Sequence, residues 1–301
     1  MLVITGATGN IGKTATALLL ERGERVRVIG RDRTKLQHLV EIGAEAAVGD
    51  LNDLPFVTDA FKGAKAVFAM IPPPQFSIAS FRNHQREVGE TIASALAAAK
   101  VGYVVNLSSQ GAELSSGTGP VVGLHEQEER LNRLDLNVLH LRPTYFMENL
   151  MASIPFIREH GIAGSAVRGD IKLAMIATRD IAEKVAGHLA ALDFQGKEVR
   201  DLLGERDLTL QEAFGVIGRR IGMPDLKYVQ FNPDEAFKGM TMSGFSSDTA
   251  RLFIEMSKAL NEGLFGVNRP RNAANTTPTS IEEFAKSFAA VYQGAVHMHA
   301  E

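Results

Sequence analysis

Three glycines near the amino terminus, Gly6, Gly9 and Gly12, are spaced at intervals of three residues. They follow an apolar run at 2–5 and lead into a run of helical composition at 11–23. Glycine permits a tight turn and lets backbone N–H groups approach an anion, and the start of a helix adds partial positive charge. This combination predicts a loop that binds the pyrophosphate of a dinucleotide; a glycine turn without a ligand is the alternative. The expected contacts come from Gly6, Thr8, Gly9, Asn10, Ile11 and Gly12.

The next apolar run ends in Gly30, Arg31 and Asp32. Dinucleotide sites that prefer NAD carry an acidic residue at the end of the second strand, where it accepts hydrogen bonds from the ribose 2′-OH. Gly30 takes that position, and Arg31 offers a cation for a 2′-phosphate. We therefore expect NADP(H) to be preferred over NAD(H). Two alternatives stay open: Asp32 pairs with Arg31 or with a ribose hydroxyl, or these charges form a solvated loop.

Further candidates follow the ends of other apolar runs. Because the carboxyl ends of parallel strands meet at one edge of a sheet, where ligands bind, residues at these ends are expected to contact the cofactor. They are Asp50, Leu51, Met70, Ile71, Pro72, Ser108 and Pro143. Asp50 is expected to accept from the adenine amine, and the alternative is a residue that only caps a helix or turn.

Candidate substrate contacts are Phe76, Tyr145, Phe146 and Asn149. Three of them follow the last apolar run of the first half, at the edge where ligands bind in such sheets. Phe76 is expected to reach a planar acceptor, and the alternative is that it only anchors its loop. For Phe146, packing between the two parts of the chain is the alternative.

These positions require a fold in which short strands alternate with helices. Apolar runs at 2–5, 25–30, 44–50, 65–71, 102–109 and 136–143 alternate with helical segments, which predicts an α/β fold with a doubly wound parallel Rossmann sheet. After Leu150 the pattern changes and becomes mainly helical. We expect a dinucleotide-binding domain at 1–150 and a smaller substrate lobe at 151–301. The domain boundary near residue 150 is approximate, because a strand at 196–204 can return to the main sheet.

The composition narrows the class of protein. The 301 residues carry a net charge of −3, so no basic surface for nucleic acid or an anionic membrane is expected. No cysteine is present, which excludes disulfides and thiolate chemistry. We expect no secretory signal, no membrane span, a cytoplasmic location and a small-molecule partner, with a homodimer among the oligomeric options. His297 and His299 are too few for a metal site, so none is expected.

Several motifs together resemble the NmrA-like branch of the atypical short-chain dehydrogenases/reductases. They are TGATGNIG at 5–12, MIPPP at 70–74, LSS at 107–109, LHEQEERL at 124–131 and LRPTYFMENL at 141–150. The resemblance implies a Rossmann domain with a small α/β lobe and a substrate bound between them. Members of this family include NADPH-dependent quinone reductases, a triphenylmethane-dye reductase and redox-sensing regulators.

In the wider short-chain reductase family a tyrosine acts as general acid, a lysine four residues later lowers its pKa, and a serine polarises the carbonyl. Here Ser108 is present, but His125 and Glu129 stand where the tyrosine and lysine are expected. A glutamate has the wrong sign of charge for the lysine's task. His125 either donates a proton to the substrate or is a surface histidine paired with Glu129.

The missing pair disfavours ketone reduction, because a ketone that accepts hydride becomes a strongly basic alkoxide. A quinone becomes a phenolate, whose conjugate acid has a pKa of about 10 and which can take a proton from water. We therefore expect an NADPH-dependent oxidoreductase that delivers hydride to a flat electrophile such as a quinone or dye. An NADP(H)-binding redox sensor with little turnover is the alternative, and an epimerase-type enzyme is disfavoured.

Overall fold

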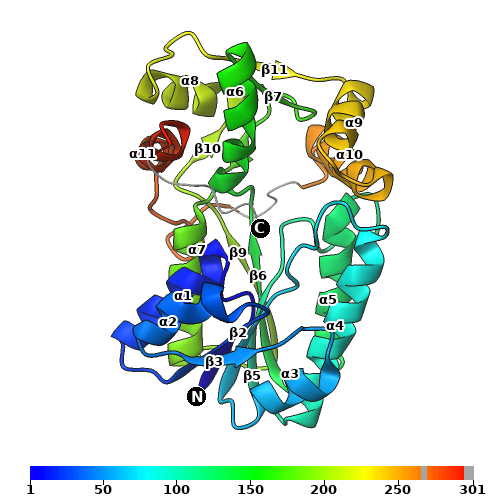
Figure 1. The fold of residues 1–301 in the computed structure, drawn as a ribbon, viewed down its shortest axis with the longest axis vertical. Coiled ribbons are helices and arrows are strands. Elements are labelled where there is room, and N and C mark those ends of the chain that lie inside the picture. Colours follow the sequence, from blue (N-terminus) through cyan, green and yellow to red (C-terminus); the bar gives the residue numbers. More distant parts are fainter. Residues whose placement is uncertain (266–269, 295–301) are drawn as a thin grey trace.

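A seven-stranded parallel sheet forms the centre of the larger part of the molecule, in a computed structural model that describes residues 1–265 and 270–294 (Figure 1). Its strand order is β3-β2-β1-β4-β5-β6-β9, so the order reverses between β1 and β4. The strands are β1 (Leu2–Ile4), β2 (Val26–Gly30), β3 (Glu45–Val48), β4 (Ala66–Ala69), β5 (Tyr103–Leu107), β6 (Asn137–Pro143) and β9 (Lys197–Leu202). The predicted doubly wound Rossmann sheet is confirmed.

Helices cover both faces of this sheet, with α1, α2 and α7 on one face and α3, α4 and α5 on the other (Figure 1). Their bounds are α1 (Asn10–Glu21), α2 (Arg33–Glu41), α3 (Leu54–Phe61), α4 (Phe81–Ala98), α5 (Val122–Asn132) and α7 (Thr178–Ala191). Sequence signals set several of the starts: the side chains of Asp32, Asp53 and Ser80 accept backbone N–H bonds at the first turns of α2, α3 and α4.

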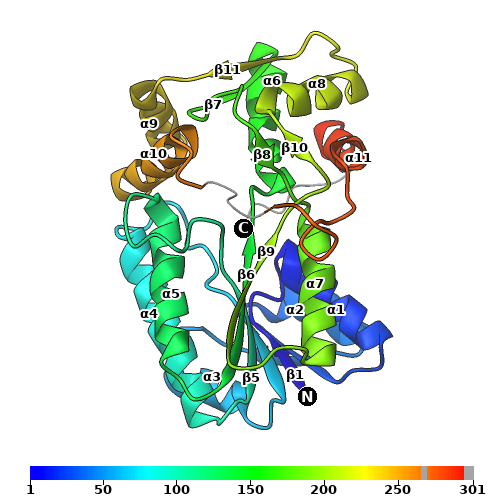
Figure 2. The same cartoon turned by 180° about the vertical axis from the view of Figure 1, so that it is seen from behind.

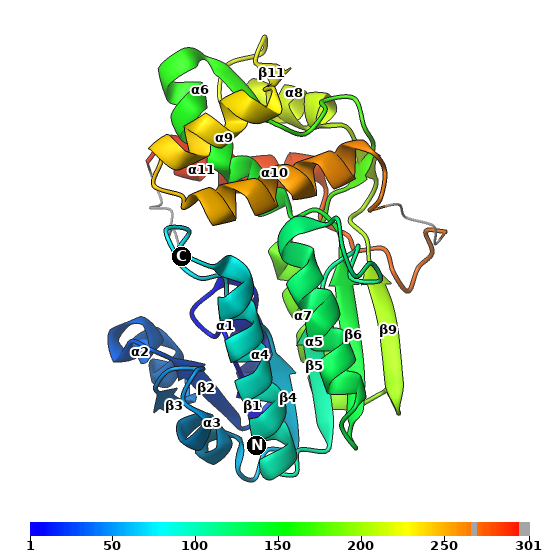
Figure 3. The same ribbon diagram turned by 90° about the vertical axis from the view of Figure 1, so that its right-hand side faces the viewer.

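The smaller part lies beyond the carboxyl ends of the central strands (Figure 3). Two short sheets hold it together, β7 with β11 in parallel and β8 with β10 antiparallel. Its elements are η2 (Met147–Ser153), α6 (Ile154–His160), β7 (Ile162–Ser165), β8 (Leu173–Ala174), β10 (Asp207–Leu208), α8 (Leu210–Arg220), β11 (Lys227–Gln230), α9 (Pro233–Met242), α10 (Ser247–Asn261) and α11 (Ile281–Tyr292).

Two segments after residue 150 belong to the central sheet. Strand β9 pairs with β6, and α7 packs against α1, with Ile181, Val185 and Leu189 in the same core as β1 (Figure 2). A crossover through a helix is the usual way to add a parallel strand, and α7 leads into β9 in this way. Because α7 and β9 follow residue 150 and yet belong to the central sheet and its core, the division of the chain into two domains at residue 150 stays a prediction.

Helix α10 links the smaller part to the larger one. It packs against η1 (Gly119–Val121), the short turn that leads into α5. Gly119 has a φ of 59°, and a Cβ there would overlap with the carbonyl oxygen of Leu252 in α10. Only glycine therefore permits both this backbone conformation and this close approach.

Candidate functional site

The residues predicted to contact a cofactor all lie at one edge of the central sheet. The glycine loop follows β1, Arg31 follows β2, Asp50 follows β3, Met70 follows β4 and Ser108 follows β5, while Pro143 ends β6. All these strands are parallel, so their carboxyl ends point the same way, toward the smaller part of the molecule (Figure 3). The order reverses between β1 and β4, and such a reversal is where ligands bind in open α/β sheets.

The glycine loop is packed so closely that side chains are excluded at two positions. Gly6 has a φ of 61°, and a Cβ there would overlap with the Met70 sulfur; a Cβ on Gly12 would overlap with the carbonyl oxygen of Gly6. The hydroxyl of Thr5 accepts from the Met70 N–H at 2.9 Å and donates to the Phe68 carbonyl at 3.0 Å, which ties the loop to β4. The loop therefore has a fixed shape.

The start of α1 is open to an anion. Gly9 caps this helix with an extended backbone, and no side chain accepts from its first N–H groups. Orphan N–H groups behind a close-packed glycine turn are the arrangement that holds a phosphate. The residues present thus fit the pyrophosphate of a dinucleotide, and the individual contacts stay predictions.

Asp32 and Asp50 each accept hydrogen bonds from residues that follow them closely in the chain. Asp32 accepts from the Thr34 N–H at 2.8 Å and so caps α2, which leaves Arg31 exposed and without an ion pair among the described residues. Asp50 accepts from the backbone N–H and the side-chain amide of Asn52, at 2.9 and 3.0 Å, and forms a turn. Asp50 has the turn role that the sequence left open, and a contact with adenine stays a prediction.

A buried network, which the sequence analysis missed, holds Ser108. Its hydroxyl donates to the carboxylate of Glu128 in α5, and Arg142 in β6 donates to both oxygens of that carboxylate, at 2.9 and 2.6 Å. Glu113 is a second partner of Arg142, at 3.1 Å. All three residues of the network itself are less than a tenth exposed, whereas Glu129 is exposed. The four-residue spacing from His125 predicted Glu129 as the site residue. Leu124 and Leu131 lie on the same helix face as Glu128, and their apolar character was the sequence signal that this face is buried.

His125 is half-buried, and its Nδ1 lies 2.9 Å from the carbonyl oxygen of Ala112. A carbonyl only accepts, so Nδ1 carries the proton. In the neutral ring Nε2 is then an acceptor and has no proton to give. No described contact joins His125 to Glu129, so the predicted surface pair does not form.

The predicted substrate residues separate into two groups. The ring of Phe76 stacks on Phe245 at 4.5 Å and meets Phe253 edge-on at 5.5 Å, so Phe76 anchors its loop to α10. Phe146 packs against the core of the central sheet, and Asn149 is exposed. Tyr145 is the member of the set that lines a pocket.

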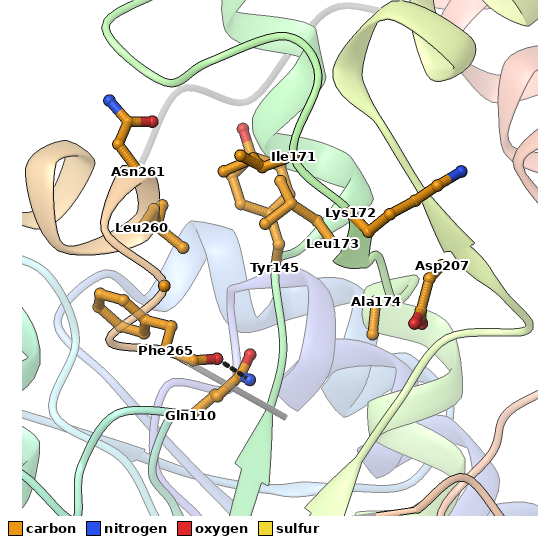
Figure 4. Close-up of a pocket in the computed structure, with 11 residues that line it drawn as sticks. Gln110, Tyr145, Ile171, Lys172, Leu173, Ala174, Asp207, Leu260, Asn261 and Phe265 are labelled. Atoms are coloured by element: carbon orange, nitrogen blue, oxygen red, sulfur yellow. Dashed lines mark hydrogen bonds between the residues drawn. The ribbon is translucent and has the colours of Figure 1, made fainter. Parts of the chain in front are cut away.

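That pocket has a volume of about 200 Å³ and lies between the sheet edge and the smaller part of the molecule (Figure 4). Its apolar walls come from Tyr145, Ile171, Leu173, Leu260 and Phe265. Beside Tyr145, its polar lining side chains are Gln110, Lys172, Asp207 and Asn261.

The charges at the pocket are already neutralised. Lys172 donates to both carboxylate oxygens of Glu212, at 2.9 and 2.8 Å, and Arg271 pairs with Asp207. The walls are thus aromatic and aliphatic with no unpaired charge among the described residues that line them, which suits a flat and apolar ligand. Gln110 and Phe265 were not predicted from the sequence, because they come together from positions 155 residues apart.

Within residues 1–265 and 270–294, no group of three or more His, Asp or Glu side chains could hold a metal ion. In the same part of the chain, no helix is long and apolar enough to cross a bilayer. His297 and His299 lie outside the described residues.

The reversed strand order and the glycine loop define a dinucleotide-binding protein of the Rossmann type. The chain belongs to the NmrA-like family, which it matches over residues 1–285. The resemblance read from its motifs is therefore confirmed.

Proteins similar to this chain include several reductases. Over 265 residues the chain is 26% identical to a (4-alkanoyl-5-oxo-2,5-dihydrofuran-3-yl)methyl phosphate reductase of Streptomyces griseus, covering 87% of this chain and 88% of the relative. It is 27% identical to an NAD(P)H azoreductase of Xenophilus azovorans, covering 98% and 100%. The solved structure of an NADPH-dependent quinone oxidoreductase from Escherichia coli, in complex with NADPH, shares the fold with a TM-score of 0.81 at 22% identity, covering 95% and 99%.

Proposed function

We propose that this protein is an NADPH-dependent oxidoreductase that passes hydride directly to a flat electrophilic acceptor such as a quinone or an azo dye. One observation carries the proposal: the glycine loop and an apolar, aromatic-walled pocket lie at the same edge of one sheet. When bound, NADPH would supply the hydride. The azoreductase and quinone oxidoreductase among the similar proteins support the same class of reaction.

The residues after β2 support NADPH over NADH. Gly30 carries no side chain at the position where NAD-preferring sites have an acidic residue, and Oδ1 of Asp32 is used as the cap of α2. Arg31 is exposed and has no described ion pair, so its guanidinium is available to a 2′-phosphate.

The choice of acceptor follows from how the Ser108 hydroxyl and the His125 ring are hydrogen-bonded. The Ser108 hydroxyl is committed to Glu128, and His125 in its neutral form has no proton on Nε2. A ketone needs a proton in the transition state, whereas a quinone becomes a weakly basic phenolate that water can protonate. The site then works chiefly by positioning the acceptor beside the nicotinamide.

A redox sensor that binds NADP(H) with little turnover is the second candidate. The same commitment of Ser108 and His125 favours it, because neither side chain offers a proton to a substrate. The two candidates differ in one property, the consumption of NADPH when an acceptor is present.

Anaerobic incubation with NADPH and a panel of quinones, azo dyes, cationic dyes and imines separates them. We expect NADPH absorbance to fall with quinones or azo dyes at a rate proportional to protein concentration. Tight binding of both NADP⁺ and NADPH without oxidation in the presence of any acceptor would replace the enzyme by the sensor.

A further inference from the structure

Among the described residues that line the pocket, Tyr145 is the one that carries a hydroxyl. We propose that this hydroxyl donates a hydrogen bond to the far oxygen of the acceptor, the atom on which negative charge develops after hydride arrives at the other end. The inference rests on the proposed function and makes Tyr145 the residue that favours acceptors able to carry charge on a terminal oxygen.

The backbone of Tyr145 is held on both sides. Its carbonyl accepts from the Ile176 N–H at 2.9 Å, and the Met147 N–H donates to the Ile176 carbonyl at 2.9 Å. Its ring packs against the core of the smaller part of the molecule. The Tyr145 hydroxyl therefore has a fixed place in the pocket wall. Little side-chain conformational entropy is lost when a ligand binds, because the Tyr145 ring is already held.

Among the described residues the Tyr145 hydroxyl has no hydrogen-bond partner, in contrast to Tyr228 nearby. The hydroxyl of Tyr228 lies 2.7 Å from the Ser165 hydroxyl and donates to the Val167 carbonyl at 2.7 Å. Burial raises the pKa of Tyr145 above its ordinary value, so its phenol keeps its proton and acts as a donor at neutral pH.

The other polar side chains around the pocket are engaged. Asn261 accepts from the Arg168 N–H at 2.7 Å and donates to the Ala166 carbonyl at 3.0 Å. Gln110 donates to the Phe265 carbonyl. With Lys172 and Asp207 in ion pairs, Tyr145 is the described lining residue whose hydrogen-bonding group is wholly unused.

The pocket has two ends that differ in chemistry. Gln110 follows β5 and lies on the side of the sheet edge, while the Tyr145 ring points away from Gln110 toward the smaller part of the molecule (Figure 4). A flat acceptor in this pocket thus presents one end to the sheet edge, where the nicotinamide is proposed, and the other to the Tyr145 hydroxyl.

A 1,4-quinone takes up two electrons and one proton when it accepts hydride. When NADPH is bound, its hydride would form an O–H bond at the near carbonyl, whose π bond would be lost, and NADP⁺ would remain. The displaced electron pair moves through the ring, which becomes aromatic, and the far oxygen becomes a phenolate. Tyr145 stabilises this anion by a hydrogen bond in a poorly hydrated site, and water then supplies the proton.

Binding of two small probes in the presence of NADP⁺ tests this role without turnover. 4-Nitrophenolate carries the anionic oxygen, and nitrobenzene has the same ring without it. Because a hydrogen bond to a charged group is strong, we expect Tyr145→Phe to weaken 4-nitrophenolate binding at least tenfold and nitrobenzene binding by less than threefold. Tyr228→Phe is the matched control and should leave the ratio of the two affinities as in the wild type.

Equal losses for both probes in Tyr145→Phe, no loss for either, or a wild type that binds neither would overturn the inference. Failure of the proposed function is a separate result. It would show as wild-type protein that oxidises no NADPH with any acceptor, whatever the probe affinities are.

Discussion

Glu128 and Arg142 form a bidentate ion pair in the interior, with N–O distances of 2.9 and 2.6 Å, and each side chain is about a tenth exposed or less. The pair joins α5 to β6, and through the Ser108 hydroxyl it also fixes the end of β5. Charges removed from water require compensation, so this contact constrains the sheet edge where the cofactor is proposed.

Removing the charge of Glu128 should therefore be costly. We expect Glu128→Gln to lower the free energy of unfolding by about 3 kcal/mol, because Arg142 loses its principal buried counter-charge. Glu129→Gln, one residue away on the exposed side of α5, should change it by less than about 0.5 kcal/mol. Urea unfolding followed by circular dichroism measures both, and equal effects of the two changes would contradict the role of the buried pair.

This pair also marks how far the sequence can predict the site. The motif around Glu129 resembles an active-site spacing, whereas Leu124 and Leu131 indicate that Glu128 faces inward. That Glu128 meets Arg142 depends on how α5 packs against β6. Alternation of apolar runs predicted the sheet, since buried parallel strands must be apolar. The contact of Phe76 with Phe245, and the bond from Gln110 to Phe265, join distant segments and leave no periodic signal.

The glycine loop should not tolerate a methyl group at residue 12. A Cβ there would overlap with the Gly6 carbonyl oxygen, so Gly12→Ala must displace the loop that is proposed to hold the pyrophosphate. We expect NADPH affinity to fall more than tenfold, measured by calorimetric titration. Gly187→Ala in α7 is the control, because a Cβ there meets open space; it should bind NADPH normally and be more stable by roughly 0.5–1 kcal/mol. Unchanged NADPH affinity in Gly12→Ala would remove the loop from the cofactor site.

Arg31 should discriminate between the two nicotinamide cofactors. A guanidinium bound to a 2′-phosphate acts only on NADPH, so Arg31→Ala is expected to weaken NADPH binding at least tenfold and NADH binding by less than threefold. Titration of the variant with each reduced cofactor provides the comparison. Equal losses for the two cofactors would contradict the assignment.

His140 should make the fold sensitive to mild acid. Its Nε2 lies 3.0 Å from the Asn132 side-chain oxygen, and its Nδ1 accepts from the Asn106 amide at 3.1 Å, so the ring is neutral. Burial lowers the pKa of His140 to about 4 from an ordinary value of about 6.5. The unfolded chain then takes up the proton first as the pH falls.

The contribution of His140 is complete above about pH 6.5 and is lost between about pH 6.5 and 4, by about 3 kcal/mol at most. Urea unfolding at pH 7.5 and pH 5 should show the loss in the wild type, and His140→Gln should reduce the difference between the two pH values. The same pH dependence in the wild type and the variant would assign it to other groups.

The most direct test of the central claim is the transfer of the hydrogen itself. NADPH carrying deuterium at C4, in one or the other configuration, is mixed anaerobically with the protein and a quinone, and the loss of NADPH absorbance is followed. Direct hydride transfer predicts quinone-dependent oxidation that is slowed by deuterium in one configuration and much less by deuterium in the other. No oxidation with either labelled cofactor, although both NADPH and NADP⁺ bind, would contradict the assignment as a reductase.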